Sequence, residues 1–344
     1  MAFYDGLFDA LGLRDWCDQG EDAGPMSMAD LLNANNANAT DPNAQAFPFP
    51  SLDNLHEVCG SIMQTRDFTS GIKEAFLAAR PGLKAFLDPI TQPLSWMLDG
   101  ALWLFTETPW WLLIIALLAL TWVASRSAAT VVLVGITLFV LAFIDHFEMA
   151  MQTLSIIFVC TSICVVFGVP IGILMSKFDT LRRMTVPILD LLQTLPTFVY
   201  LIPLIFLFSV TESKLYGIAI ILYAIVPVIR LTDLGIRLVD PDVVEAADAF
   251  GMTGLQRLIK VEFPLALPNI MAGVNQTIMM SLSMVVIASL VSAPGLGRPV
   301  LQGIRELEIG VGLVAGLGIV MLAVILDRAS KAALSRVDMT NKKQ

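Results

Sequence analysis

The residues whose types and spacing say most about function form one short polar stretch in the second half of the chain. Within it, Pro241 and Asp242 predict the start of a helix, because proline fits the first helical turn and a carboxylate is favoured at the positive N-terminal end. Gly251 predicts the end of that helix, since glycine readily takes the left-handed conformation found just past a helix. A second helical segment is expected from Thr253 to Lys260. Two short helices joined at a glycine form a rigid projection, which is suited to docking.

Residues suited to bond chemistry are few. The sequence has two histidines, His56 and His146, and neither belongs to a nucleophile–base or metal-ligand pattern. His146 lies between Asp145 and Glu148, where a proton relay or a metal site is conceivable. A short polar turn between two apolar runs is better explained as the boundary of a membrane. We therefore expect no catalytic residue, no enzyme activity and no metal site in this chain.

The composition argues against a soluble enzyme. Of the 344 residues, 56% are hydrophobic and 15% are charged, with a mean hydropathy of +0.75, whereas soluble proteins carry about 25% charged residues. The net charge of −9 lies in residues 1–100, which hold 14 acidic and 5 basic side chains against 16 and 16 in the remainder. Cys160 and Cys164 are interpreted as packing residues of a membrane helix, and a disulfide between Cys17 and Cys59 is left open.

Seven apolar runs approach the length of about 20 residues that a membrane-spanning helix needs. They lie near positions 109–125, 128–144, 150–176, 184–210, 215–229, 265–292 and 309–326. The fourth run contains Asp190, which we interpret as a structural acid, either paired with Arg182 or Arg183 or placed at a helix start, the alternative being a functional acid within the membrane. The sequence thus predicts an all-α, polytopic membrane protein with about seven transmembrane helices.

Lysine and arginine gather after the third, fifth and seventh runs. Cytoplasmic loops of membrane proteins carry an excess of these residues, so these three regions are expected in the cytoplasm. Their members are Lys177, Arg182, Arg183, Arg230, Arg237, Arg257, Lys260, Arg328, Lys331, Arg336, Lys342 and Lys343. Seven crossings and a cytoplasmic C-terminus place the N-terminus outside.

Four regions are expected along the chain. Residues 1–69 form an acidic, largely disordered extracytoplasmic tail, because an Asn- and Ala-rich stretch within it offers little apolar surface to bury. Residues 70–106 form either an amphipathic helix on the outer face or a linker helix packed against the bundle. The transmembrane domain is 107–335, with a cytoplasmic loop over 231–264, and residues 336–344 are a cytoplasmic tail.

The long cytoplasmic loop resembles the coupling-loop signature of ABC importer permeases. That signature is Glu-Ala-Ala, three residues, Gly, nine residues and an aliphatic-x-apolar-Pro tetrad. The matching positions here are Glu245, Ala246, Ala247, Gly251 and Pro264, with Val261 and Phe263 standing where Ile and Leu are more usual. The strings 190–203, 273–277, 283–289 and 318–328 are similar to permease subunits of glycine betaine/proline betaine importers. The resemblance covers roughly residues 90–335.

The resemblance implies a type I permease fold in a bacterial inner membrane and a set of partners. Two copies of the chain would pair, and each would seat its 242–254 helices on a cytoplasmic ATPase subunit. An extracytoplasmic binding protein would deliver the substrate, and no nucleic acid is implied. ATP and Mg²⁺ would bind to the ATPase, because this sequence lacks the G-x-x-x-x-G-K-[ST] phosphate loop. This chain itself is expected to hold no cofactor.

The substrates implied by the resemblance are quaternary-ammonium solutes: glycine betaine and proline betaine, with choline, carnitine and trimethylamine N-oxide as further candidates. Aromatic rings hold such cations by cation–π attraction, so Phe198 and Tyr200 are candidate pathway residues, with ordinary packing as the alternative. A polar run in the sixth segment either lines the pathway or joins helices. Its candidate residues are Asn275, Gln276, Thr277 and Ser283.

An ion- or proton-coupled secondary transporter is the alternative function. Such a transporter is expected to carry charges within the membrane and inverted repeats. Asp190 is nearly alone in this respect, and no internal repeat is evident in the sequence.

Overall fold

The computed structural model describes residues 65–337, and all regular structure within that range is helical. Its elements are α5 (Thr65–Glu107), α6 (Trp110–Ser125), α7 (Ala128–Phe143), α8 (Phe147–Lys177), α9 (Asp179–Thr194), α10 (Thr197–Leu207), α11 (Ser213–Arg237), α12 (Pro241–Ala249), α13 (Gly254–Arg257), a π turn (Leu258–Glu262), α14 (Phe263–Ala288), a 3₁₀ turn (Ser289–Val291), α15 (Gly297–Arg305) and α16 (Ile309–Val337). The chain divides into two units, Met1–Gly82 and Leu83–Gln344. The first is described only as the beginning of α5, and the arrangement below concerns the second.

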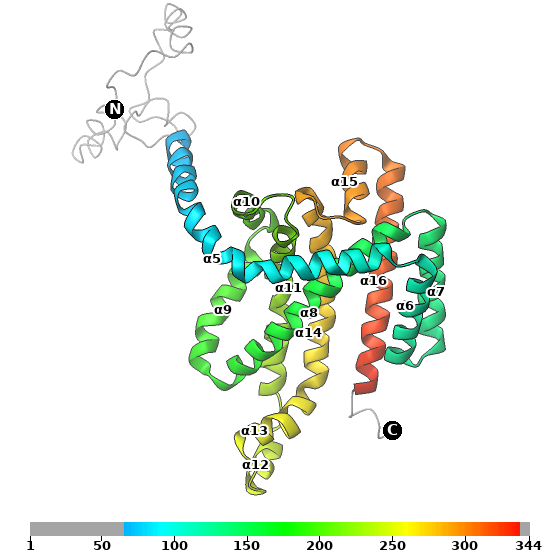
Figure 1. Cartoon of the computed structure of the whole chain (residues 1–344). Helices are drawn as coiled ribbons and strands as arrows, with labels where there is room; N and C mark the ends of the chain where they lie inside the picture. The colour runs from blue at the N-terminus through cyan, green and yellow to red at the C-terminus, as the bar shows by residue number, and fades with distance from the viewer. Residues whose placement is uncertain (1–64, 338–344) are drawn as a thin grey trace, which may run out of the picture. The chain divides into compact units, whose positions relative to one another are not determined.

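Four helices, α8, α11, α14 and α16, are long and apolar enough to cross a membrane. The shortest of the four, the apolar part of α16, has 24 residues, or about 36 Å at 1.5 Å per residue, which exceeds the roughly 30 Å of hydrocarbon. Helix α11 packs between α8 and α14 (Figure 1). The third, fifth, sixth and seventh predicted runs are therefore confirmed as helices of spanning length.

Two glycines allow this close packing. A Cβ atom added at Gly172 of α8 would lie 2.7 Å from the carbonyl oxygen of Ile229 on α11, and one added at Gly273 of α14 would lie 3.1 Å from the Cα of Val228. Small residues let helix backbones approach one another in membranes, where dispersion contacts replace the hydrophobic effect as the driving force. The three central helices therefore form a tightly packed block.

The fourth predicted run, 184–210, is not a single helix. It is broken between α9 and α10, which meet at an angle of 95°. Leu195 is extended (φ −66°, ψ 130°) and Pro196 caps α10, because a proline disfavours helical backbone in the residue before it. Pro203, in contrast, lies inside α10 and does not end it.

The first two predicted runs correspond to α6 and α7, which have 16 residues each. At 1.5 Å per residue they are about 24 Å long, shorter than the hydrocarbon layer. The described residues thus contain four helices of spanning length, or up to six spans if each sharply bent helix pair is counted as one. The all-helical membrane architecture is as expected, and the number of unbroken spans is smaller than seven.

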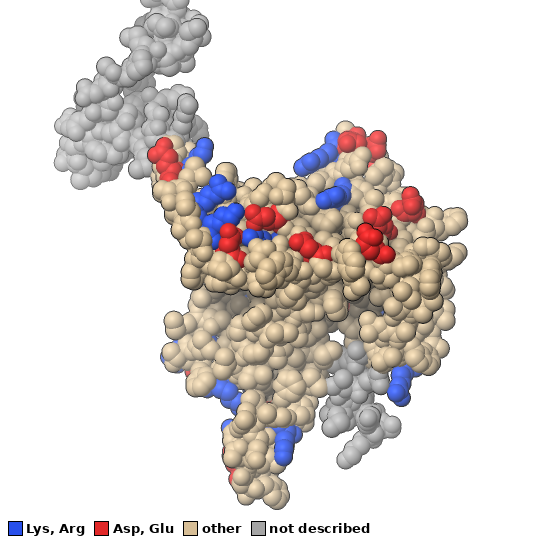
Figure 2. Space-filling model, viewed as in Figure 1, with Lys and Arg blue, Asp and Glu red and all other residues tan. Residues whose placement is uncertain are grey.

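Charged side chains gather toward the two ends of the helix bundle. Figure 2 shows a band without charge between them on the face that it presents. Helices α12, α13 and the end of α16 lie at one end, which we call the α12 end, and α10 and α15 lie at the other, the α15 end (Figure 1). Among the described residues, the basic positions expected in one compartment after the third, fifth and seventh runs belong to the end of α8, to α9, to the second half of α11, to α13 and the π turn, and to the last part of α16. Lys342 and Lys343 lie outside the described residues.

Residues 83–107 of α5 run across the bundle nearer the α15 end (Figure 1). One face is packed, with Leu98 fully buried, and Lys214 of α11 pairs with Asp88 at 2.7 Å and with Glu212 at 2.8 Å. Burial alone would raise the pKa of Glu212, but hydrogen bonds from Lys214 and from the Ser209 N–H lower it below its ordinary value.

The opposite face of this part of α5 exposes Phe86, Ile90, Trp96 and Trp103. This part of α5 is thus packed on the bundle by one face and presents a second, apolar face. Helix α5 is also one continuous helix through Pro81, Pro89 and Pro93. The predictions for residues 1–64 and 338–344, including Cys17 and Cys59, lie outside the described residues.

Candidate functional site

Helices α12 and α13 form the projection at the α12 end of the bundle (Figure 1). Helix α12 begins at Pro241, and the carboxylate of Asp240 accepts a hydrogen bond from the Asp242 N–H at 3.0 Å. It ends at Ala249, and Gly251 follows with φ +76°, a conformation that favours glycine. The helix start and the glycine stop predicted from the sequence are both confirmed.

The second helix of the projection differs from the prediction. Thr253 and Gln256 form a capping box at its start, but α13 ends at Arg257 and continues through a π turn directly into α14. Lys260 is therefore inside the π turn, and Pro264 is the second residue of α14. Because α11 also extends to Arg237, the segment between the long helices is shorter than the predicted 231–264 loop.

The signature residues occupy two sides of α12. Ala247 is buried, and its neighbour Val244 packs against a cluster that includes Ile236 and Ala266 of the long helices. Glu245 and Ala246 are exposed, as is Gly251. One side of α12 thus anchors the projection, and the other side is free to contact a partner.

Phe250 is a candidate site residue that the sequence analysis did not single out. Its side chain is 85% exposed, at the tip of the projection immediately before Gly251. Leu255 and Ile259 are also exposed nearby along the chain. A large aromatic residue next to a chain-reversing glycine was the available signal. An exposed aromatic ring on a rigid tip is suited to fill an apolar pocket of a partner protein.

The aromatic pathway candidates of α10 lie in different environments. Tyr200 is buried, and its hydroxyl donates to the Met284 Sδ at 3.8 Å, which joins α10 to α14. Phe198 is 53% exposed on the same short helix. The structure therefore gives Tyr200 a packing role and leaves the ring of Phe198 free.

The polar run of α14 is divided in the same way. The Asn275 side chain donates to the Asp327 carboxylate at 3.5 Å and accepts from the Ser330 hydroxyl at 2.5 Å, both on α16. Thr277 is fully buried, and its hydroxyl has no hydrogen-bond partner among the described residues. Gln276 and Ser283 are exposed. Asn275 joins two helices, whereas Gln276 and Ser283 face away from the bundle core.

Asp190 pairs with Arg230 of α11. The expectation that it forms an ion pair is confirmed, and the expectation that Arg182 or Arg183 is its partner is wrong. Arg182 instead pairs with Asp233 at 3.0 Å. Helix α9 lies against α11 here, so the nearest cation comes from a residue 40 positions later in the chain.

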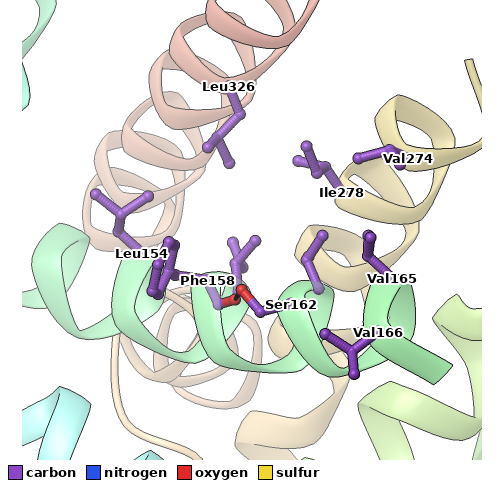
Figure 3. A pocket seen from close by; sticks show the side chains of 10 residues that line it. Leu154, Phe158, Ser162, Val165, Val166, Val274, Ile278 and Leu326 are labelled. Carbon is purple, nitrogen blue, oxygen red and sulfur yellow. Dashed lines mark hydrogen bonds between the residues drawn. The ribbon is translucent and has the colours of Figure 1, made fainter. Parts of the chain in front are cut away.

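An open groove of about 420 Å³ lies between α8, α14 and α16. Figure 3 shows the lining side chains, which include Phe158 and Ser162 from α8, Ile278 from α14 and Leu326 from α16. The Ser162 hydroxyl is used locally, because it donates to the Phe158 carbonyl at 2.7 Å. The groove is suited to apolar surface, such as a lipid chain or another helix, and offers no anionic group to a cation.

No group of three or more metal-ligating side chains occurs within residues 65–337. Cys160 and Cys164 are buried free thiols inside α8, as interpreted from the sequence. The Nδ1 atom of His146 lies 2.6 Å from the Ile144 carbonyl oxygen, so one of its ring nitrogens is engaged by the local turn.

Comparisons with known proteins agree with this architecture. The family model for the binding-protein-dependent transport system inner membrane component matches residues 168–338. The glycine betaine transport system permease protein OpuAB of Bacillus subtilis is 43% identical over 248 residues, covering 72% of this chain and 86% of the relative. The glycine betaine/proline betaine permease protein ProW of Escherichia coli is 41% identical over 292 residues, covering 85% of this chain and 79% of the relative.

A solved structure titled as an inward-facing conformation of the MetNI methionine ABC transporter shares the fold, with a TM-score of 0.51 and 21% identity over 56% of this chain and 95% of that chain. Most of each sequence relative is covered at more than 40% identity. The chain therefore belongs to the inner-membrane permease family of binding-protein-dependent ABC transport systems, as a transport subunit and not an enzyme.

Proposed function

We propose that this chain is the permease of an ATP-driven importer for quaternary-ammonium solutes, with glycine betaine and proline betaine as the first candidates. The observation that carries the proposal is the rigid α12–α13 projection, which presents Glu245 and Phe250 to a partner beyond the apolar band. Relatives named for glycine betaine, carnitine and trimethylamine N-oxide transport support the substrate class. The same relatives favour an ABC importer over an ion- or proton-coupled transporter.

The partners follow from the same geometry. The exposed side of α12 docks on a cytoplasmic ATPase subunit, which holds ATP and Mg²⁺. A second copy of this chain completes the pathway, and an extracytoplasmic binding protein delivers the solute at the α15 end. The switch between outward and inward access is a two-state change that ATP binding to the ATPase pair favours in one direction.

The proposed orientation puts the α12 end in the cytoplasm of a bacterial inner-membrane protein and the acidic N-terminal tail outside. The support is the excess of lysine and arginine on that end.

The proposed pathway includes the exposed side chains of α14 and α10. Gln276 lies on the exposed side of a spanning helix, where an amide facing lipid would be unfavourable, so it faces water or the second copy. Ser283 is also exposed, but its hydroxyl already donates to the Met279 carbonyl at 3.0 Å. Phe198 adds an aromatic face that can attract a methylated ammonium, worth about 0.5–2 kcal/mol per contact.

Reconstituted vesicles test the function directly. With the ATPase and the binding protein present, uptake of labelled glycine betaine is expected only when ATP is supplied to the α12 end, and proline betaine is expected to compete. Uptake that follows a proton or sodium gradient without ATP would contradict the proposal.

Thiol labelling tests the orientation. In intact cells, a membrane-impermeant reagent is expected to label Cys17. In a variant lacking the native cysteines, Leu255→Cys, which is 67% exposed on α13, is expected to react only after the cells are opened. The reverse pattern would invert the topology.

Truncation of the tip residue tests docking. Phe250→Ala is expected to weaken binding of the ATPase by about 2 kcal/mol, or about thirtyfold in Kd, because an aromatic anchor is lost. Affinity measured on nanodisc-embedded permease checks this. Phe143→Ala is the matched control, since Phe143 is 83% exposed on α7 at the other end of the bundle. Equal affinity of the Phe250→Ala variant and the native protein would exclude an anchoring role.

Replacement of the exposed amide tests the pathway. Gln276→Leu keeps the side-chain size and removes one polar contact, so initial uptake is expected to fall between about twofold and tenfold with unchanged binding of the ATPase. Gln152→Leu, a half-buried amide near the start of α8, is the control. Normal uptake by the Gln276→Leu variant would remove this residue from the pathway.

A further inference from the structure

Glu262 is a buried carboxylate at the junction between the projection and the membrane helices. Glu262 is 3% exposed and is the last residue of the π turn that joins α13 to α14. One oxygen, Oε1, accepts from the Arg257 Nε at 3.0 Å, and the other, Oε2, pairs with the Lys177 Nζ. Each oxygen is thus held by a cation from a different element, the projection on one side and the end of α8 on the other.

Arg257 extends this chain of charges to α12. Its Nη1 donates to both carboxylate oxygens of Asp248, at 2.8 and 2.6 Å. The sequence of ion pairs Asp248–Arg257–Glu262–Lys177, which we call the coupling clamp, therefore runs from α12 through the π turn to the last residue of α8. No other ion pair among the described residues reaches α12.

A second buried carboxylate lies at the turn between α8 and α9, which we call the α8–α9 corner. Asp233 of α11 is 5% exposed, and it accepts from the Arg182 Nε at 3.0 Å and from the Arg237 Nε at 2.9 Å. Arg237 also donates to the Met175 carbonyl at 2.9 Å and to the Asp179 carboxylate at 2.7 Å. The end of α8 is thereby fixed to α11 as well as to the projection.

These contacts favour one discrete arrangement. A buried carboxylate is strongly unfavourable when a partner is removed, and a pair with good geometry adds specificity of conformation more than net stability. A π turn is a local irregularity of a helix and is frequent at functional sites. Without the clamp, this turn is the place where α12 and α13 could bend relative to α14. With it, α12, the π turn and the end of α8 are held together.

We propose that Glu262 is a positioning residue of the coupling step: it fixes the α12–α13 projection to the end of α8, so that displacement of the projection by the ATPase moves α8 and α9. This inference rests on the proposed function. The clamp is distinct from the docking surface. Glu262 is buried, and its carboxylate contacts Arg257 and Lys177 of this chain rather than a partner protein.

The test uses the complete complex in vesicles, with the permease, ATPase and binding protein present, and measures solute taken up per ATP hydrolysed. Glu262→Gln is expected to insert, to bind the ATPase with native affinity and to support hydrolysis, while uptake per ATP falls at least about fivefold, the lower range of typical coupling free energies. Glu306→Gln, an exposed acid following α15 at the other end, is the control and is expected to leave the ratio unchanged.

Two further variants extend the test, and Lys177→Met alone decides it if Glu262→Gln fails to assemble. Lys177→Met removes one cation and leaves Glu262 paired with Arg257. The double variant Lys177→Met/Glu262→Gln removes the buried charge together with one of its partners. Both are expected to lower uptake per ATP, and the double variant less than the sum of the single changes, because the two residues act through one contact.

An unchanged ratio in all variants that assemble would overturn the inference while leaving the proposed function intact. Absence of ATP-dependent uptake in the native complex would instead count against the proposed function itself. A loss of ATPase binding by the Lys177→Met variant would assign the clamp to folding of the docking surface and likewise overturn the positioning role.

Discussion

The pairing of charges at the edge of a low-dielectric layer is the constraint on which the rest of this structure depends. A charged side chain at the centre of a bilayer costs about 3 kcal/mol or more, so charges either leave the apolar band or share partners. At the α12 end, Glu262 and Asp233 are almost completely buried, and each is held by two cations. Because these cations come from α8, α9, α11 and α13, pairing the two carboxylates also determines where four elements meet.

Local chemistry made the projection predictable, and long-range contacts made its surroundings unpredictable. Pro241 and Gly251 act within their own turn of chain, so their positions are sufficient to place the ends of α12. The end of the second helix depends on how α13 joins α14, and the partner of Asp190 depends on α11 lying against α9. A sequence shows which charges need partners but not which distant helix provides them.

The same distinction explains the pathway residues and the broken fourth run. Averaged together, α9 and α10 have the hydropathy of a membrane span, so the average does not register the backbone break that Pro196 produces. In α14, Asn275 and Gln276 are adjacent and chemically similar, yet a rotation of about 100° per residue points one at α16 and the other away from the core. The position of α16 therefore decides that Asn275 joins two helices while Gln276 is exposed, and the sequence of α14 alone does not show this.

The rigidity of the central block decides how motion at the projection can spread. Close approach at Gly172 and Gly273 leaves little room for α8, α11 and α14 to slide past one another. A displacement transmitted through Lys177 therefore reaches these helices as a unit. The angle between two helices can change where the helical hydrogen-bond pattern is interrupted. One such interruption is the break between α9 and α10, and α9 leads directly from it to the clamped α8–α9 corner. Phe198, three residues beyond Leu195, lies on the segment that follows that break.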